Sequence, residues 1–301
     1  MSGIVASCGL MNVSELDRML SRLAHRGADG SNSVTISDKW IGGRWAEGEI
    51  TSSQPMTSRD GNLHMVADGE IYNHQALLET IDNAPAGKSS IEAVLPLYAK
   101  HGVDAFAQID GPFALAIVDA AGEMVVARDP LGISPLYWYR DDERAVFASE
   151  LGAFDEELMG EARIFPPGHV WSPEAGLRRF VEPMSPSCEE QPKQDREAIL
   201  ANIRNELVAS VEAQMMDDTE VAALLSGGLD SSLIAAIGQR WMRERGKNLK
   251  TFAIGQEGSP DIMAAREVAE YLGTDHHEKM YTAEDALEVV PEVIRILEHF
   301  D

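Results

Sequence analysis

Short apolar runs separated by turn residues characterise the first 180 positions of the chain. These runs are rich in small and β-branched residues, which favours strands over helices. We predict strands at Ile4–Ala6, Met65–Ala67, Phe113–Val118, Met124–Ala127 and Ala145–Ala148.

Two longer segments interrupt these strands. Leucines at helical spacing predict a helix over Ser14–Ala24, with Ser14 as its N-cap, and a second apolar repeat predicts a helix over Ile91–Gly102. Many strands, few helices and no strand–helix alternation favour an α+β domain built on mostly antiparallel sheets.

The pattern changes after position 181. Residues 181–197 contain three prolines and few large apolar groups, which is typical of a linker. We therefore predict a first domain over residues 1–185, a linker over 186–198 and a second domain over 199–301.

The second domain alternates between helical and strand patterns. Apolar residues four positions apart, from Ile199 to Val211, predict one long amphipathic helix. The segments that follow read strand, helix, strand, helix, and this order is typical of a parallel α/β sheet. Their predicted bounds are Val221–Leu225, Leu233–Arg245, Leu249–Ile254 and Ile262–Leu272.

Composition narrows the class of protein. The 301 residues are 44% hydrophobic, and no apolar run reaches the length of a membrane span. Fifty acidic and 25 basic residues give a net charge of −25, which disfavours nucleic acid and anionic membranes as partners. Two cysteines, Cys8 and Cys188, and a first segment unlike a signal peptide predict a cytoplasmic protein.

The most specific motif is Ser226-Gly227-Gly228-Leu229-Asp230-Ser231-Ser232, between a predicted strand and a predicted helix. Two glycines allow close approach of the backbone, and the amides at a helix N-terminus donate to anions. Asp230 would repel phosphate unless it holds Mg²⁺, so the string suits a pyrophosphate with its metal. The alternative is a glycine-rich turn with a Ser/Asp cap and no ligand.

This string resembles the PP-loop of ATP pyrophosphatases. With Thr251–Gly255, Gly258–Asp261 and Gly273–His277, it resembles the synthetase domain of the glutamine-dependent asparagine synthetase family. The resemblance implies Mg²⁺ at Asp230 and adenine between Leu224 and Ile254. The ATP-binding set that it implies is Leu224, Ser226, Gly227, Gly228, Asp230, Ser231, Ser232, Ile254 and Gly255.

The first domain resembles the glutaminase of the same family. His25–Gly30 is similar to its H-R-G-P-D-G, and Gly69–His74 matches its G-E-I-Y-N-H. The resemblance implies an N-terminal-nucleophile hydrolase fold, in which a cysteine after the initiator Met attacks glutamine. It also implies glutamine binding by the residues at positions Arg44, Asp68, Gly69, Glu70 and Ser90.

Three positions depart from that pattern. Ser2 stands where the family has its cysteine, and a hydroxyl is a poorer nucleophile at neutral pH. Asp68 replaces the Asn that, with the Gly at position 69, donates to the oxyanion, and Ser90 replaces an Asp that binds the amine of glutamine. Cys8 lies six residues from Ser2 and cannot substitute. We therefore expect an inactive glutaminase.

The resemblance implies an ATP-dependent ligase that adenylates the β-carboxylate of aspartate, with ammonia or glutamine as nitrogen source, and a possible homodimer. Two alternatives stay open: a related ligase acting on another substrate, as in β-lactam synthetases and peptide cyclases, or a non-catalytic nucleotide-binding scaffold. The family's S-G-E-G-S-D-E string and a later Lys are not found in residues 233–301. We expect the second domain to be incomplete and this polypeptide alone not to turn over.

Overall fold

The computed structural model describes residues 2–9, 12–46, 53–81, 89–182, 195–215 and 220–298. The chain forms two compact units, Met1–Ser185 and Pro186–Asp301, and each is considered by itself. Most of the predicted linker lies outside the described residues, and the helix that follows begins at Arg196.

Two six-stranded antiparallel sheets form the centre of the first unit. In spatial order, one sheet contains β10 (Arg163–Ile164), β8 (Tyr137–Arg140), β9 (Arg144–Ala148), β1 (Gly3–Gly9), β3 (Lys39–Trp45) and β2 (Gly30–Ile36). The other contains β12 (Gly176–Arg179), β11 (His169–Ser172), β7 (Met124–Arg128), β6 (Phe113–Asp119), β5 (Leu63–Gly69) and β4 (Met56–Thr57).

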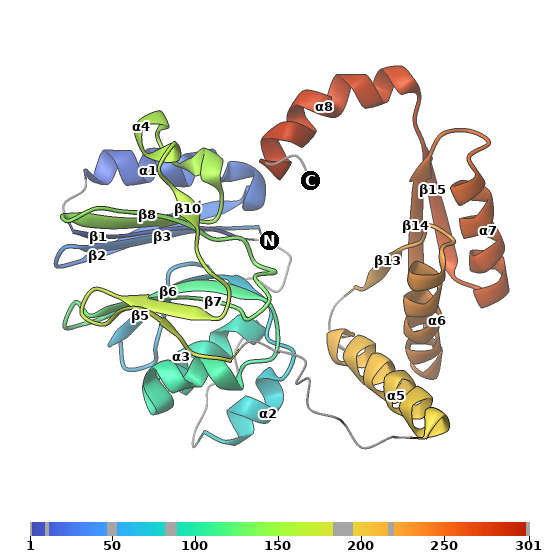
Figure 1. Ribbon diagram of the computed structural model, residues 1–301, viewed down its shortest axis with the longest axis horizontal. Helices are drawn as coiled ribbons and strands as arrows, with labels where there is room; N and C mark the ends of the chain where they lie inside the picture. The colour runs from blue at the N-terminus through green and yellow to red at the C-terminus, as the bar shows by residue number, and fades with distance from the viewer. Residues whose placement is uncertain are drawn as a thin grey trace. The chain divides into compact units, whose positions relative to one another are not determined.

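Helices cover the outer face of each sheet, so the first unit has four layers (Figure 1). The helix α1 covers the first sheet and α3 the second. The helices of this unit are α1 (Val13–Arg22), α2 (His74–Glu79), α3 (Val94–His101) and α4 (Glu156–Met159), with 3-10 turns at Ala24–Arg26, Ser90–Ala93, Gly102–Gln108 and Leu151–Ala153.

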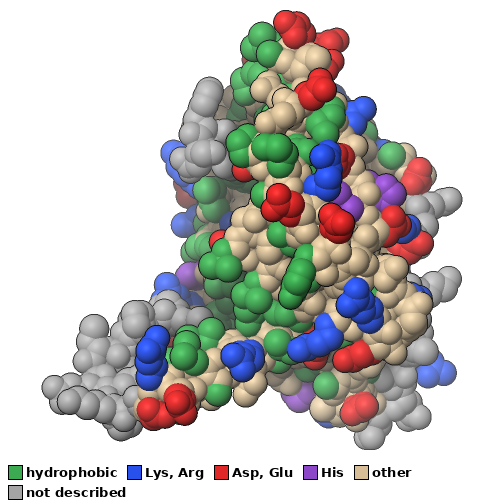
Figure 2. All heavy atoms as spheres, turned by 90° about the vertical axis from the view of Figure 1, so that its right-hand side faces the viewer, with side chains coloured by type: hydrophobic (Ala, Val, Ile, Leu, Met, Phe, Trp, Pro, Cys, Tyr) green, Lys and Arg blue, Asp and Glu red, His purple; other side chains and the backbone are tan. Residues whose placement is uncertain are grey.

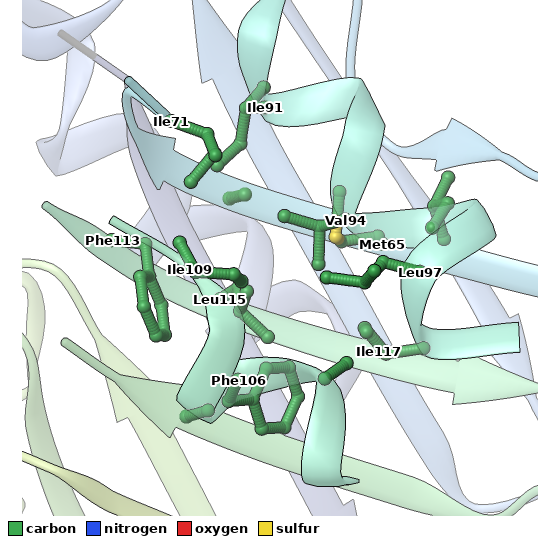
Figure 3. Close-up of a cluster of buried hydrophobic side chains, with 14 of the residues drawn as sticks. Met65, Ile71, Ile91, Val94, Leu97, Phe106, Ile109, Phe113, Leu115 and Ile117 are labelled. Atoms are coloured by element: carbon green, nitrogen blue, oxygen red, sulfur yellow. The ribbon is translucent and has the colours of Figure 1, made fainter. Parts of the chain in front are cut away.

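The strand β6 shows how one sequence serves two cores. Its alternate residues Ala114, Ala116 and Val118 face the other sheet, where small side chains let the sheets approach. Phe113, Leu115 and Ile117 face the opposite way. Figure 3 shows these side chains meeting Val94 and Leu97 of α3, together with Met65 of β5. This double burial explains the continuous apolar run in the sequence.

The second unit has a three-stranded parallel sheet in the order β13–β14–β15. Its elements are α5 (Arg196–Gln214), β13 (Ala222–Leu224), α6 (Leu229–Glu244), β14 (Lys250–Gly255), α7 (Pro260–Leu272), β15 (Asp275–Met280) and α8 (Ala283–Leu297). The α/β order predicted from the sequence is confirmed.

Within the described part of the second unit, only one face of this sheet is covered. Thr251, Ala253 and Gly255 of β14 are buried on the side of α6 and α7, whereas Phe252 and Ile254 are exposed. The exposed fraction is 67% for Ile254 and 81% for Leu224 of β13. The apolar segment Val221–Leu225, predicted as a strand, therefore forms a strand that is exposed on this face.

Two predicted helix starts also differ from the structure. The N-cap of α1 is Asn12, whose side chain accepts from the main-chain nitrogen of Ser14 at 2.9 Å, so Ser14 lies inside the helix. The helix α6 begins at Leu229, four residues before the predicted Leu233, because Gly228 caps it and the end of the glycine-rich string forms its first turn.

Candidate functional site

The first candidate site lies at the start of β1. Ser2 is 3% exposed, and its main-chain nitrogen donates to Asp68 Oδ1 at 2.7 Å. Asp68 belongs to β5 in the other sheet, so this bond joins the two sheets where glutamine chemistry is predicted. The structure thus brings Ser2 and Asp68 together.

Arg26 is the centre of this site, although the sequence analysis assigned it no role. Its guanidinium donates from Nε to the Ser2 carbonyl at 2.9 Å, from Nη2 to Asp68 Oδ2 at 2.8 Å and from Nη1 to Glu150 Oε1 at 3.0 Å. His25 Nε2 lies 2.8 Å from the other Glu150 oxygen. The sequence signal for these residues was the H-R-G string. In the structure, its His25 and Arg26 form ion pairs with Glu150 and Asp68.

The remaining predicted glutamine-site residues have main-chain partners. Arg44 pairs with Gly3 in the register of β3 and β1, and its Nε donates to the Gly27 carbonyl at 2.8 Å. Ser90 is buried, and its hydroxyl accepts from the main-chain nitrogen of Ile71 at 3.1 Å. Ser90 therefore supports the turn after β5.

The turn after β5 requires glycine. Gly69 has φ +150°, and a Cβ there would lie 2.1 Å from the Pro112 carbonyl oxygen. Glu70 follows it and is exposed, with its main-chain nitrogen bonded to the same carbonyl at 3.0 Å. Burial, together with the acidic groups of Glu70, Asp110 and Asp129, raises the pKa of Tyr72, so this phenol stays neutral.

The second candidate site is the glycine-rich loop between β13 and α6. Gly227 has φ +77°, and a Cβ there would lie 2.5 Å from the backbone of Ala264 in α7. The hydroxyls of Ser226 and Ser231 lie 3.0 Å apart, and Ser231 Oγ accepts from the main-chain nitrogen of Ser226 at 3.3 Å. The loop therefore folds back on the first turn of α6.

One hydroxyl of this loop has no partner. Ser232 Oγ is buried and makes no hydrogen bond among the described residues. A buried hydroxyl costs free energy unless it is paired, so an unpaired one in a folded protein requires an explanation, of which a bound ion or ligand is one. This orphaned donor supports a ligand with acceptor oxygens at the loop.

A cavity of about 260 Å³ lies beside the loop, and it brings predicted nucleotide-site residues together. Its lining includes Leu224, Ser226, Ser231 and Ile254. It also includes Phe252 and Asp261, which lie in the quoted Thr251–Gly255 and Gly258–Asp261 strings but were given no role of their own.

Gly255 and Asp230 lie at the same end of the sheet. A Cβ at Gly255 would lie 2.7 Å from the Ile262 side chain, so glycine lets α7 approach β14. Asp230 is exposed in the first turn of α6. The described residues contain no group of three or more His, Cys, Asp or Glu able to hold a metal ion, so a metal at Asp230 would depend on ligand oxygens.

Comparison with known proteins gives a match for each unit. The family model described as "Glutamine amidotransferase domain" matches residues 1–166, and the model described as "Asparagine synthase" matches residues 202–300. The chain belongs to the glutamine-dependent asparagine synthetase family. This confirms the family predicted from the two sets of motifs in the sequence.

The family relatives match along this whole chain but are longer. An asparagine synthetase (glutamine-hydrolysing) of Arabidopsis thaliana is 37% identical over 320 residues, and the match covers 100% of this chain and 54% of that relative. An asparagine synthetase (glutamine-hydrolysing) from Oryza sativa subsp. japonica is 36% identical, and that match covers 100% of this chain and 53% of the relative. The chain thus spans about half the length of the curated relatives it matches.

Solved structures support the fold. A glutamine phosphoribosylpyrophosphate amidotransferase from B. subtilis, complexed with ADP and GMP, superposes with a TM-score of 0.50 at 19% identity over 95% of this chain and 70% of its own. A structure of the allosteric regulatory enzyme of purine biosynthesis superposes with a TM-score of 0.51 at 19% identity, and the match covers 92% of this chain and 80% of that one. The predicted N-terminal-nucleophile hydrolase-like class is confirmed.

None of the described helices is both long and apolar enough to cross a membrane.

Proposed function

We propose that this chain carries the amidotransferase unit and the phosphate-binding loop of an ATP-dependent asparagine-forming ligase. The reaction adenylates the β-carboxylate of aspartate with release of pyrophosphate, and ammonia then displaces AMP to form the amide. The observation that carries this proposal is the loop at Ser226–Ser232, which adjoins the cavity lined by Leu224 and Ile254.

The loop fits the phosphates of ATP. The amides at the start of α6 and the Ser226, Ser231 and Ser232 hydroxyls are donors suited to anionic oxygens. Leu224 and Ile254 offer exposed apolar surface that suits adenine.

Asp230 is the residue that would hold Mg²⁺. A single carboxylate together with phosphate oxygens is a usual magnesium ligand set. Mg²⁺, when bound, offsets the charge of the phosphates and that of Asp230. The amides and hydroxyls of the loop are the groups that would hold the pyrophosphate end.

Free ammonia is the proposed nitrogen source, and the glutaminase is proposed to be inactive. The Ser2 hydroxyl is a weak nucleophile, and Asp68 offers no side-chain donor to an oxyanion as long as its carboxylate is ionised. Loss of one oxyanion donor typically costs about 10²–10³ in rate. A homodimer is a further proposal made on the family resemblance alone, and a cytoplasmic location is a proposal that rests on the two cysteines of the sequence.

An assay of the full-length protein tests this function. The protein is incubated with ATP, Mg²⁺, aspartate and either ammonium or glutamine, and pyrophosphate and asparagine are measured. We expect both products with ammonium and no asparagine with glutamine. Asparagine from glutamine would overturn the inactive glutaminase, and pyrophosphate without asparagine would indicate another acceptor. A complete lack of pyrophosphate would favour a binding scaffold.

A further inference from the structure

Both oxygens of the Asp68 carboxylate are engaged by groups around residue 2. One accepts from the Ser2 nitrogen at 2.7 Å and the other from Arg26 at 2.8 Å. The carboxylate therefore does more than leave an oxyanion donor missing: it binds the segment from which a nucleophile would act. Asp68 is 6% exposed, so water screens this interaction little.

We propose that Asp68 determines the nitrogen source, because it holds residue 2 in a setting where neither a nucleophile nor its base can form. This rests on the proposed ammonia-dependent ligase. It goes further because it attributes the loss of glutamine hydrolysis to Asp68 as well as to the missing cysteine. Asp68 is then a positioning residue for the N-terminal segment.

The charges around residue 2 support this assignment. Asp68 and Glu150 are two buried carboxylates that share one guanidinium, Arg26, and His25 contacts Glu150. An anion formed at the residue 2 side chain would add a negative charge beside Asp68. A nearby like charge in a buried setting disfavours ionisation of the residue 2 side chain.

The nitrogen of residue 2 is also committed. It donates its hydrogen to Asp68 at 2.7 Å, a length typical of a charge-assisted bond. Residue 2 follows Met1 in this chain, so its nitrogen is a peptide amide and not a base; after removal of Met1, the adjacent carboxylate would favour the protonated form of the free amine, which has no lone pair to offer. The same contact therefore disfavours both the nucleophile and the base.

A cysteine at position 2 gives a direct probe. The proteins compared are Ser2→Cys, Ser2→Cys with Asp68→Asn, and Ser2→Cys with Glu150→Gln. The third is a matched control, because Glu150 also pairs with Arg26 but is not bonded to Ser2. The rate of iodoacetamide reaction at residue 2 is followed against pH by peptide mass spectrometry, and glutamate release from glutamine is measured on the same samples.

We expect the thiol introduced by Ser2→Cys to titrate above the ordinary thiol pKa of about 8.5, with no glutamine hydrolysis. Adding Asp68→Asn lowers that pKa by about one unit, makes alkylation at pH 7 about tenfold faster and allows measurable glutamate release. Adding Glu150→Gln changes alkylation less than threefold. Hydrolysis by Ser2→Cys alone, or equal alkylation with and without Asp68→Asn, would overturn the proposal.

Two features keep the test decisive. If Asp68→Asn does not fold, the alkylation profile of Ser2→Cys alone still tests the proposal. A pKa of the introduced thiol below the ordinary value would show that the Asp68 carboxylate does not disfavour its ionisation. Asparagine formation from ammonium is measured separately, and its failure would count against the ligase while leaving the alkylation result to stand.

Discussion

Cys8 illustrates how burial sets the chemistry of a single residue. It lies on β1, half-buried, and burial raises the pKa of its thiol despite the opposing effect of Lys39. Only the thiolate reacts, so alkylation of Cys8 at pH 7 is expected to be slower than in the unfolded chain by about tenfold, and to rise steadily above pH 9. Peptide mass spectrometry, which separates Cys8 from Cys188, measures the rate. Equal rates in folded and unfolded protein would contradict this.

Gly227 and Gly228 make a matched pair for testing the loop. Gly227→Ala places a Cβ 2.5 Å from the Ala264 backbone at a φ of +77°, whereas the Cβ of Gly228→Ala meets only Ser226 Oγ at 3.4 Å. We expect Gly227→Ala to weaken ATP binding by at least about tenfold, since αL strain alone costs ~1–2 kcal/mol. Gly228→Ala should weaken it much less. Calorimetric titration of the full-length protein with ATP and Mg²⁺ measures both, and equal losses would contradict the geometry.

The sequence alone places the loop residues at a strand–helix junction because their arrangement is local, and their role in binding ATP stays a prediction. Ser226, Gly227 and Ser231 are near neighbours along the chain, and a strand–helix junction is enough to place them. The Asp68 network was not predicted, because Ser2, Arg26, Asp68 and Glu150 come from four distant segments. Only tertiary structure shows that Asp68 faces Ser2 and Arg26.

At the scale of elements, Asp129 organises the turn that leaves β7. It is 1% exposed, and its carboxylate accepts from the main-chain nitrogens of Leu131, Ile133 and Ser134, each at 3.0 Å. Asp129→Asn presents an amide donor to these donors and is expected to lower the free energy of unfolding by about 2–3 kcal/mol. Urea unfolding followed by tryptophan fluorescence in a Trp241→Phe background reports the first unit, which holds the other four tryptophans.

Asp119 provides the comparison for that measurement. Its Oδ1 also accepts two main-chain nitrogens, from Ala121 and Glu123 at 2.9 Å each, but in a partly exposed turn. Water can replace those bonds, so Asp119→Asn should cost less than about 1 kcal/mol. A loss as large as that of Asp129→Asn would show that burial is not the deciding factor.

Strands made of continuous apolar residues were easier to predict than strands that contain glycines and polar residues. β6 and β7 appear in the sequence as continuous apolar runs, whereas β2 and β3 contain glycines and polar residues and were missed. The residues of β3 gain their place by pairing with β1, from Cys8↔Lys39 to Gly3↔Arg44. Pairing of this kind has no local pattern to detect.

At the scale of the whole molecule, the net charge of −25 has to be reconciled with the proposed polyanionic ligand, ATP. Acidic side chains are spread over the face seen in Figure 2 among basic and apolar ones. We expect ATP to bind at least about tenfold more weakly in EDTA than in Mg²⁺ at low salt. Added salt should reduce this difference in affinity, because it screens the repulsion between ATP and the acidic protein. Adenosine, which is uncharged, serves as the control and should respond to neither condition. ATP binding that is indifferent to EDTA would contradict the role given to Mg²⁺.

The position of β1 has a consequence for the timing of synthesis. The strand lies between β3 and β9, and its pairing with β9 joins Val5 to Ala148. At roughly 5–20 residues per second on the ribosome, about 7–29 s pass between the synthesis of these two partners. Ser2, only 3% exposed in the folded unit, remains within reach of other proteins during that interval. We expect Ser2 to be modified more readily before β9 pairs with β1 than afterwards.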